Sequence, residues 1–297
     1  MICAPRGELS QSLVLALRFV TPLRSISDAI LLTPRSTVEY VMTIDTARSY
    51  DALADHYHLI FENWETSVER QAALLSSILK RNCGLPGTAR ILDCACGIGT
   101  QALGLARLGF RVLGTDLSTH AVERARLEAS RRKLDIHFSV RNMLDLGCLG
   151  DSHFDAVICM DNSLPHLESD EQLIQAAIQI RAQLRPGGVF MASIRDYDRL
   201  VEEKPVIEGP SFYRDRGRRR IVFQVWDWLD DRRYVFHLYI TREFAGGWQT
   251  LHTSALYYAL LRDDLLAALS KAGFRNARWL FQGETGFYQP IVLAEAG

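Results

Sequence analysis

Apolar residues recur every three or four positions from about residue 50 onward, which is the spacing of the buried face of a helix. Leu53, Tyr57, Ile60 and Phe61 carry the first such pattern. A second pattern predicts a helix near 68–80, and glycine and proline residues at 84–87 then interrupt it. The folded part of the chain is therefore expected to begin with helices.

From residue 90, short apolar runs alternate with segments of helical spacing. The runs predict strands near 90–94, 111–115, 136–140, 154–160 and 189–194. The segments between them predict helices near 101–109, 119–132 and 170–184, the last one stopped by the Pro-Gly-Gly at 186–188. Strands that alternate with helices indicate an α/β fold with a Rossmann-like, doubly wound parallel sheet.

The pattern changes after residue 196. Residues 221–229 and 234–244 are rich in aromatic and β-branched side chains and flank a charged turn, which predicts an antiparallel hairpin. A third strand over 250–260 is an open alternative. We expect residues 197–260 to form an inserted antiparallel sheet that acts as a lid on the substrate side. A last helix is predicted at 262–272, and two closing strands are predicted near 276–282 and 290–295.

Composition excludes several classes of protein. The 297 residues are 48% hydrophobic and 23% charged, which is ordinary for a globular protein. The net charge of -1 gives no general attraction to nucleic acid or to an anionic membrane. No apolar run approaches the roughly 20 residues of a membrane helix. We therefore expect a cytoplasmic protein with no nucleic-acid or membrane partner, and a homo-oligomer is compatible with the sequence.

Cysteine spacing and the first segment add two expectations. The six cysteines are scattered, and the pair Cys94 and Cys96 lacks a second pair of ligands nearby, so no metal site is predicted. Residues 1–41 contain arginine and serine but few acids, which a transit peptide would share. We expect instead that residues 1–41 are a disordered extension, or that translation starts at Met42, and that residues 42–297 form one domain.

The candidate chemistry lies where the first predicted strand ends. Residues 91–100 read Ile-Leu-Asp-Cys-Ala-Cys-Gly-Ile-Gly-Thr, and Asp116 ends the next strand. Gly97 and Gly99 would let the backbone approach a ligand, and the following helix would point its free N–H groups at it. Asp116 can accept hydrogen bonds from the hydroxyls of a ribose. The pattern predicts an adenosine-type cofactor.

The same loop also fits the dinucleotide fingerprint, so a nicotinamide enzyme is an alternative. Three features favour a different cofactor. Asp93 lies close enough to repel a pyrophosphate but would attract a cation. Asn142 and Met143 follow the third strand, where they could hold an adenine. Finally, the two closing strands resemble the antiparallel hairpin that distinguishes methyltransferases from nucleotide dehydrogenases.

The loop with Asp116 resembles motifs I and II of class I S-adenosylmethionine-dependent methyltransferases. Residues 154–166, Phe-Asp-Ala-Val-Ile-Cys-Met-Asp-Asn-Ser-Leu-Pro-His, and residues 194–198, Ile-Arg-Asp-Tyr-Asp, are similar to glycine and glycine/sarcosine N-methyltransferases. The resemblance implies the class I methyltransferase fold, with S-adenosylmethionine as cofactor. It also implies cofactor-binding roles for Tyr57, Arg70, Asp93, Ala95, Gly97, Gly99, Asp116, Asn142, Met143, Met160 and His166. Here Arg70 lies about one turn from the family's arginine, and Tyr57 replaces a tryptophan.

The resemblance also implies how an acceptor would be held. Asn162 and Arg195 match the positions that bind the amino-acid substrate, Arg195 through its carboxylate, and Tyr239 matches a tyrosine that contacts it. The expected reaction is methyl transfer to the amine of a small amino-acid-like acceptor. Three alternatives stay open: a different small metabolite as acceptor, a nicotinamide-dependent oxidoreductase, and a non-catalytic protein that binds S-adenosylmethionine.

Overall fold

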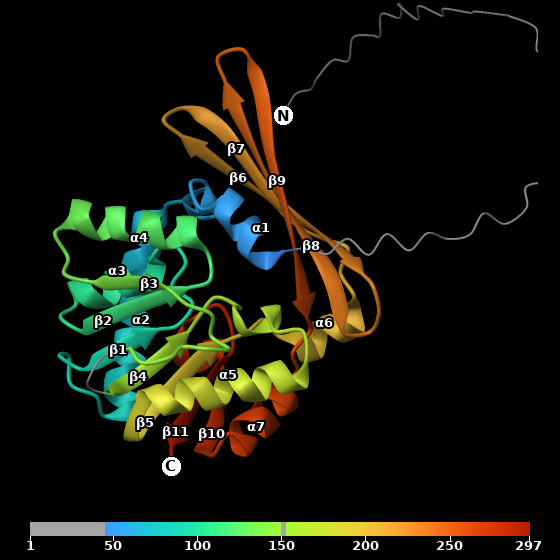
Figure 1. The fold of residues 1–297 in the computed structure, drawn as a ribbon. Coiled ribbons are helices and arrows are strands. Elements are labelled where there is room, and N and C mark those ends of the chain that lie inside the picture. The colour runs from blue at the N-terminus through green and yellow to red at the C-terminus, as the bar shows by residue number, and fades with distance from the viewer. Residues whose placement is uncertain (1–44, 150–152) are drawn as a thin grey trace, which may run out of the picture. The chain divides into compact units, whose positions relative to one another are not determined.

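The fold is built on two β-sheets, which the computed structural model describes over residues 45–149 and 153–297 (Figure 1). The expected extension at 1–41 lies outside the described residues. The larger sheet has seven strands in the order β10-β11-β5-β4-β1-β2-β3. Their bounds are β1 Arg90–Asp93, β2 Arg111–Asp116, β3 His137–Val140, β4 Phe154–Cys159, β5 Leu184–Ser193, β10 Phe274–Leu280 and β11 Ile291–Ala296.

Strand direction confirms the predicted Rossmann-like class. β1 to β5 pair in parallel, whereas β11 runs antiparallel to both β5 and β10. The strand order reverses between β1 and β4, and ligands of open α/β sheets bind at the carboxyl ends of strands beside such a reversal. The topology therefore predicts a ligand site at the loops that follow β1, β2, β4 and β5.

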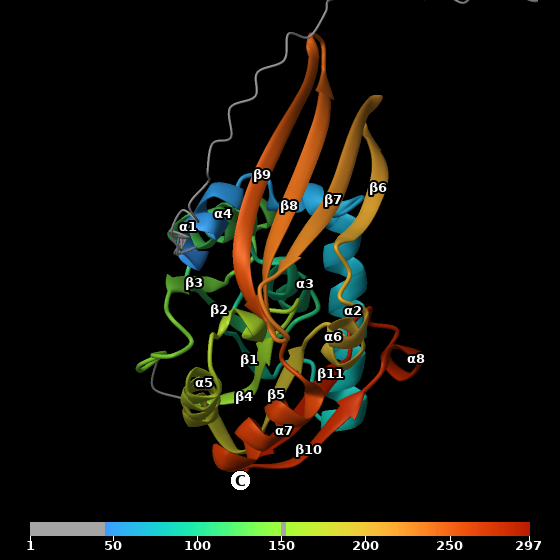
Figure 2. The ribbon, with the colours of Figure 1, turned by 90° about the vertical axis from the view of Figure 1, so that its right-hand side faces the viewer.

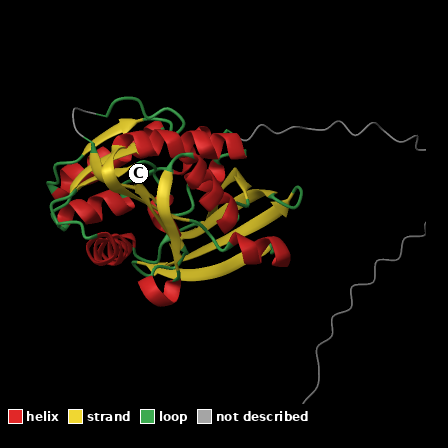
Figure 3. Ribbon diagram, turned by 90° about the horizontal axis from the view of Figure 1, so that it is seen from below, coloured by secondary structure: helices red, strands yellow, loops and turns green. Residues whose placement is uncertain are grey.

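Helices cover both faces of this sheet (Figure 3). Successive side chains of a strand point to opposite faces, so Val157 and Ile158 join different hydrophobic clusters. One face packs against α2 Trp64–Cys83, α3 Thr100–Arg107 and α4 Thr119–Arg132. The other packs against α5 Asp170–Gln183 and α7 Arg262–Lys271.

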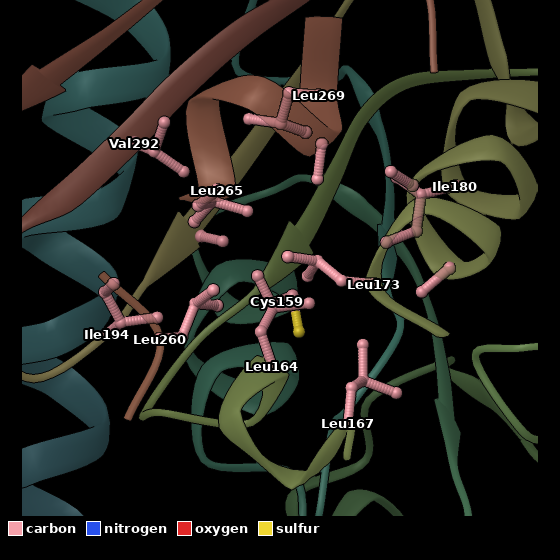
Figure 4. Close-up of a cluster of buried hydrophobic side chains, with 14 of the residues drawn as sticks. Cys159, Leu164, Leu167, Leu173, Ile180, Ile194, Leu260, Leu265, Leu269 and Val292 are labelled. Carbon is pink, nitrogen blue, oxygen red and sulfur yellow. The ribbon is translucent and has the colours of Figure 1, made fainter. Parts of the chain in front are cut away.

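The cluster under α5 and α7 is shown in Figure 4. Leu173 and Ile180 of α5, Leu265 and Leu269 of α7 and Val292 of β11 belong to this one cluster, and all five side chains are buried. Burying a leucine or isoleucine side chain contributes about 1.5–3 kcal/mol. This packing holds the antiparallel edge of the sheet in place, and with it the segments that follow β5 and precede β11.

The second sheet is antiparallel throughout, in the order β6-β7-β8-β9 (Figure 2). Its strands are β6 Ile207–Asp215, β7 Arg218–Trp228, β8 Arg233–Phe244 and β9 Gly247–Tyr258. The hairpin expected around residues 230–233 is β7–β8, and β9 is the third strand left open by the sequence. β6 and the short helix α6 Tyr197–Glu203 were not predicted, because β6 is mostly exposed and lacks alternating apolar residues.

Two local expectations were wrong. The apolar pattern from residue 50 is split between α1 Thr46–Leu53 and the 3-10 turn η1 Tyr57–Ile60, because Leu53 and Leu59 pack against Val222 and Leu238 of the second sheet rather than along one helix face. The Pro-Gly-Gly at 186–188 lies inside β5, where the pairing with β4 shifts register. The remaining short elements are η2 Leu164–His166 and α8 Gln282–Thr285.

No helix in the part of the chain that the structure describes combines the length and the apolar character needed to cross a bilayer.

Candidate active site

Two cavities open beside the carboxyl ends of the parallel strands. The first cavity, of about 360 Å³, is lined by the loop after β1, by Asp116 at the end of β2 and by residues 141–144 after β3. The second cavity, of about 700 Å³, lies between the segments after β4 and β5 and the second sheet. Both volumes lie within the usual range for small-molecule sites.

The glycine loop and Asp116 form one hydrogen-bonded unit in the first cavity. Gly97 has a φ of +52°, and a Cβ placed there would meet no atom within 4 Å, so its backbone borders open space. Its N–H donates to Oδ2 of Asp116 at 2.8 Å, and the N–H of Ser118 donates to Oδ1 at 2.9 Å. Each carboxylate oxygen keeps a further lone pair, so Asp116 can still accept hydrogen bonds from two ligand hydroxyls.

Most of the expected cofactor-binding residues line the first cavity: Tyr57, Ala95, Gly97, Asp116, Asn142, Met143, Met160 and His166. Gly99 does not. It begins α3 with a φ of +95°, and a Cβ there would come within 3.1 Å of the Leu103 side chain. Arg70 lines the second cavity instead of the first. Gly99 and Arg70 therefore do not line the first cavity with the other expected cofactor-binding residues.

Asp93 lies beneath the loop and lines neither cavity. It is fully buried, its Oδ1 is 3.4 Å from the N–H of Ala95, and its Oδ2 has no hydrogen-bond partner among the described residues. Burial raises the pKa of Asp93 to about 8, so its carboxyl group is mostly protonated at neutral pH. The repulsion of a pyrophosphate by Asp93 is therefore weaker than the sequence suggested.

Other carboxylates set the charge of the first cavity. One guanidinium, that of Arg141, lines it together with four carboxylates, those of Asp45, Asp116, Asp161 and Glu168. An acidic lining favours a cationic ligand and disfavours a pyrophosphate.

Asn162 and Arg195 both line the second cavity. Asn162 is buried, and its φ of +68° turns the chain sharply after β4. Its Oδ1 accepts a hydrogen bond from the N–H of Arg195 at 2.9 Å, and its Nδ2 donates to the hydroxyl of Tyr197 at 2.9 Å. Asn162 therefore positions the backbone that carries Arg195.

The guanidinium of Arg195 has unused binding capacity. It lies over the rings of Trp226, at 4.6 Å, and Phe236, at 5.3 Å, and its Nη2 donates to Gln224 at 3.1 Å. Its Nη1 is buried and has no hydrogen-bond partner among the described residues. Because a buried, charged donor without a partner is costly, this atom marks a place where an anionic ligand group would be stabilised.

Tyr239 is not brought to either cavity. Neighbouring side chains of β8 alternate between faces, and Leu238 and Ile240 are the ones buried toward Leu53 and Leu59. Tyr239 lies on the opposite face, stacked on Phe223 with the ring centroids 4.8 Å apart. The contact with an acceptor implied for Tyr239 therefore has no support from its position.

Three residues line both cavities: Tyr50, Tyr57 and Asp161. The sequence pointed to Tyr57 but missed Tyr50 and Asp161. Asp161 could have been found, because it directly follows a strand whose carboxyl end faces the site. Tyr50 gave no such signal, since it lies on a helix far earlier in the chain. We call these three residues the junction.

A chain of hydrogen bonds runs along the junction. His166 Nδ1 faces the carbonyl oxygen of Leu256 at 3.3 Å, so Nδ1 carries the proton and Nε2 accepts from Tyr50 at 2.9 Å. Tyr50 then accepts from the hydroxyl of Tyr257 at 3.1 Å. Burial, and to a lesser extent Arg195, lowers the pKa of His166 to about 4, which keeps the ring neutral.

Sheet order, glycine loop and acidic strand end define the class of this chain. Residues 91–188 match the family described as a methyltransferase domain. The resemblance to class I S-adenosylmethionine-dependent methyltransferases that the sequence indicated is confirmed by this match and by the relatives below.

Individual relatives differ in what they methylate. Glycine N-methyltransferase of Mus musculus is 30% identical over 158 residues, which cover 50% of this chain and 52% of the relative. Ubiquinone biosynthesis O-methyltransferase of Xanthomonas axonopodis pv. citri (strain 306) is 34% identical over 108 residues, 36% of this chain and 44% of the relative. The chain thus spans about half the length of these two relatives.

A solved structure extends the likeness over more of the chain. Streptomyces venezuelae DesVI superimposes with a TM-score of 0.69 at 22% identity, covering 81% of this chain and 97% of that one. At this identity the likeness establishes a shared fold.

The residues present fit S-adenosylmethionine, the cofactor of this class. Asp116 has free lone pairs for ribose hydroxyls, the backbone of Gly97 borders open space, and Met143 offers a soft apolar surface. The acidic lining suits the positive charge that S-adenosylmethionine carries on sulfur.

Proposed function

We propose that this protein transfers a methyl group from S-adenosylmethionine to the amine of a small, amino-acid-like acceptor bound in the second cavity. The unpartnered Nη1 of Arg195 carries this proposal, because it offers a buried cation to an acceptor carboxylate. Asn162 supports Arg195 through its backbone N–H, and the rings of Trp226 and Phe236 hold the guanidinium in place.

The arrangement of the cavities suits a displacement reaction. S-adenosylmethionine supplies a methyl group on a positively charged sulfur, and the bond from the acceptor nitrogen forms as the carbon–sulfur bond breaks. The junction residues Tyr50, Tyr57 and Asp161 border both cavities, so groups held in each can meet there. Holding two reactants in line lowers the activation barrier by up to roughly 7–11 kcal/mol.

Side chains of the second sheet would also exclude water from the acceptor and orient it. The second sheet presents Trp226, Phe236 and Tyr257 to the second cavity. Excluding water strengthens the pairing of Arg195 with a carboxylate. An amine attacks as its free base, and Tyr257 keeps a lone pair that can accept an N–H of the acceptor because its own proton is donated to Tyr50.

The test is transfer of label from S-adenosylmethionine carrying a labelled methyl group, across amino acids, amines and hydroxyl-bearing metabolites. We expect amino acids to be methylated, and Arg195→Met to raise KM for them roughly 10- to 100-fold. A hydroxyl acceptor as the best substrate would favour an O-methyltransferase, which one relative is named to be. Binding of S-adenosylmethionine without any turnover would indicate a non-catalytic protein.

The nicotinamide alternative is tested by binding alone. Because four carboxylates and one guanidinium line the first cavity, we expect S-adenosylmethionine to bind and NAD to bind far more weakly. Calorimetric titration of the protein with each cofactor measures this directly.

A further inference from the structure

We propose that Asp161 binds the ammonium group of the incoming acceptor, which loses one proton before it attacks, while Arg195 binds its carboxylate, so that the second cavity takes a zwitterionic amino acid with a large apolar or aromatic side chain. This rests on the proposed function and names the class of its acceptor.

The backbone of Asp161 is the first observation. Asp161 has a φ of +57° and is followed by Asn162 at +68°, so two consecutive non-glycine residues occupy the left-handed region. Aspartate and asparagine enter this region more readily than other residues, yet each such residue still costs about 1–2 kcal/mol. Strain of this kind persists at functional sites when the surroundings hold it. Here the N–H of Asp161 donates to Ser193 Oγ and that of Asn162 donates to Ser193 O.

The hydrogen bonds to the carboxylate are the second observation. Oδ1 accepts from the hydroxyl of Tyr288 at 2.5 Å, and Oδ2 accepts from Nε2 of Gln101 at 2.7 Å. Both partners are neutral donors, so the carboxyl group is oriented without an ion pair. Burial raises the pKa of Asp161, and a cation bound beside it would favour its charged form. No ion pair to Asp161 occurs within the described residues.

The position of Asp161 is the third observation. It lines both cavities, whereas Arg195 lines only the second. Four other carboxylates line the second cavity: Asp196 and Glu203 pair with Arg262 and Arg199, and Glu62 and Glu208 do not line the first cavity. Asp161 is therefore the carboxylate at the junction, where the reacting amine must lie. An unpaired anion there and an unpaired cation at Arg195 match the two charges of an amino acid.

The size and lining of the second cavity give the remaining part of the acceptor. A cavity of about 700 Å³ far exceeds the needs of glycine. Leu53, Ile60, Leu200, Tyr213 and Leu238 also line it. An apolar or aromatic side chain would cover these residues and gain about 25 cal/mol for each Å² removed from water.

The test measures binding without turnover, by calorimetric titration of the protein saturated with S-adenosylhomocysteine. The ligands are L-phenylalanine, 3-phenylpropionate, which lacks the amine, 2-phenylethylamine, which lacks the carboxylate, and glycine. We expect L-phenylalanine to bind most tightly. Asp161→Asn should weaken L-phenylalanine and 2-phenylethylamine roughly 10- to 100-fold and leave 3-phenylpropionate unchanged. Arg195→Met should weaken L-phenylalanine and 3-phenylpropionate but spare 2-phenylethylamine.

Control variants separate a lost charge from a disturbed fold. Asparagine tolerates the backbone of Asp161 and keeps an acceptor for Tyr288, and a thermal melt checks that the variant is folded. If it is not, Tyr288→Phe, which removes only the donor to Asp161, should weaken the two amine ligands to a smaller degree. Asp155→Asn removes a carboxylate at the opposite end of β4, where it pairs with Arg185, and should change no affinity.

Several outcomes overturn the proposal. It is wrong if Asp161→Asn leaves 2-phenylethylamine unaffected, if that variant weakens all ligands equally, if glycine binds more tightly than L-phenylalanine, or if none of the four binds. Failure of the proposed function looks different: labelled S-adenosylmethionine would then transfer no methyl group to any acceptor although the binding pattern held.

Discussion

The hydroxyl of Tyr50 lies 2.9 Å from Nε2 of His166 and joins α1, which precedes the large sheet, to the turn that follows β4. These residues are 116 positions apart in the chain. Tyr50 lines both cavities and His166 lines the first, so this hydrogen bond connects the two halves of the proposed site.

His166 should make stability depend on pH in a mildly acidic range. Its pKa is lowered from 6.5 to about 4, mainly by burial, so the unfolded chain takes up a proton between these values and the native state does not. The associated stability is present above pH 6.5 and is lost as pH falls toward 4, by up to about 1.4 kcal/mol per pH unit. Urea unfolding of wild type and His166→Gln should therefore diverge across this range. If the free energy of unfolding of the two proteins changed equally with pH, this prediction would be wrong.

Asp93 should make stability depend on pH in the opposite direction, so that its contribution is larger at low pH. Burial raises its pKa from 3.8 to about 8, so the native state holds a proton that the unfolded chain releases. The associated stability is present below about pH 4 and is lost as pH rises toward 8. Asp93→Asn, which is neutral at every pH, should flatten the dependence and be the more stable protein at pH 8. The measurement is the free energy of unfolding at pH 5 and pH 8, and an equal slope for both proteins would count against the buried, protonated carboxyl.

Gly97 and Gly99 should respond differently to alanine. Both need a positive φ, which costs alanine about 1–2 kcal/mol. At Gly97 the new methyl group would also enter the space beside the first cavity, so Gly97→Ala should weaken S-adenosylmethionine binding. At Gly99 the methyl group would meet Leu103, so Gly99→Ala should mainly lower the melting temperature. Titration and thermal melting of both variants compare the effects, and equal losses of affinity would show that backbone strain alone explains them.

Asp116→Asn should weaken the cofactor and leave the acceptor unaffected. The change replaces a charged acceptor of hydroxyl protons by an amide, and hydrogen bonds to charged groups contribute about 1.5–3 kcal/mol. We expect the Kd for S-adenosylmethionine to rise roughly 10- to 100-fold. KM for the acceptor, measured at saturating cofactor, serves as the control. A cofactor Kd that stays at the wild-type value would remove Asp116 from the ribose site.

Local patterns predicted the parallel sheet because each strand carries its own apolar run and each helix its own spacing. They missed β6, whose residues are mostly exposed and so show no alternation. They also joined α1 and η1 into one helix, because the apolar residues of both turn toward a sheet that forms more than 150 residues later. Where a partner is distant in sequence, periodicity does not reveal it.

In the candidate site, too, sequence order predicted some residues and failed for others. The loop at 94–100, Asp116, Asn162 and Arg195 lie at or shortly after the carboxyl ends of strands, and the carboxyl ends of parallel strands meet at one edge of a sheet. Sequence order alone therefore brought these residues together. Tyr239 shows the limit, since a shift of one position along a strand moves a side chain to the other face.

By itself, then, the sequence determined the class of fold and predicted the cofactor loop and the role of Arg195, because these depend on short segments whose geometry is local. Only the tertiary structure decided that Tyr50, Tyr57 and Asp161 border both cavities, and that the carboxyl group of Asp161 is held by two neutral donors. Burial and charge pairing depend on what surrounds a side chain, and at this site the surroundings come from α1, β4, the second sheet and the segment before β11.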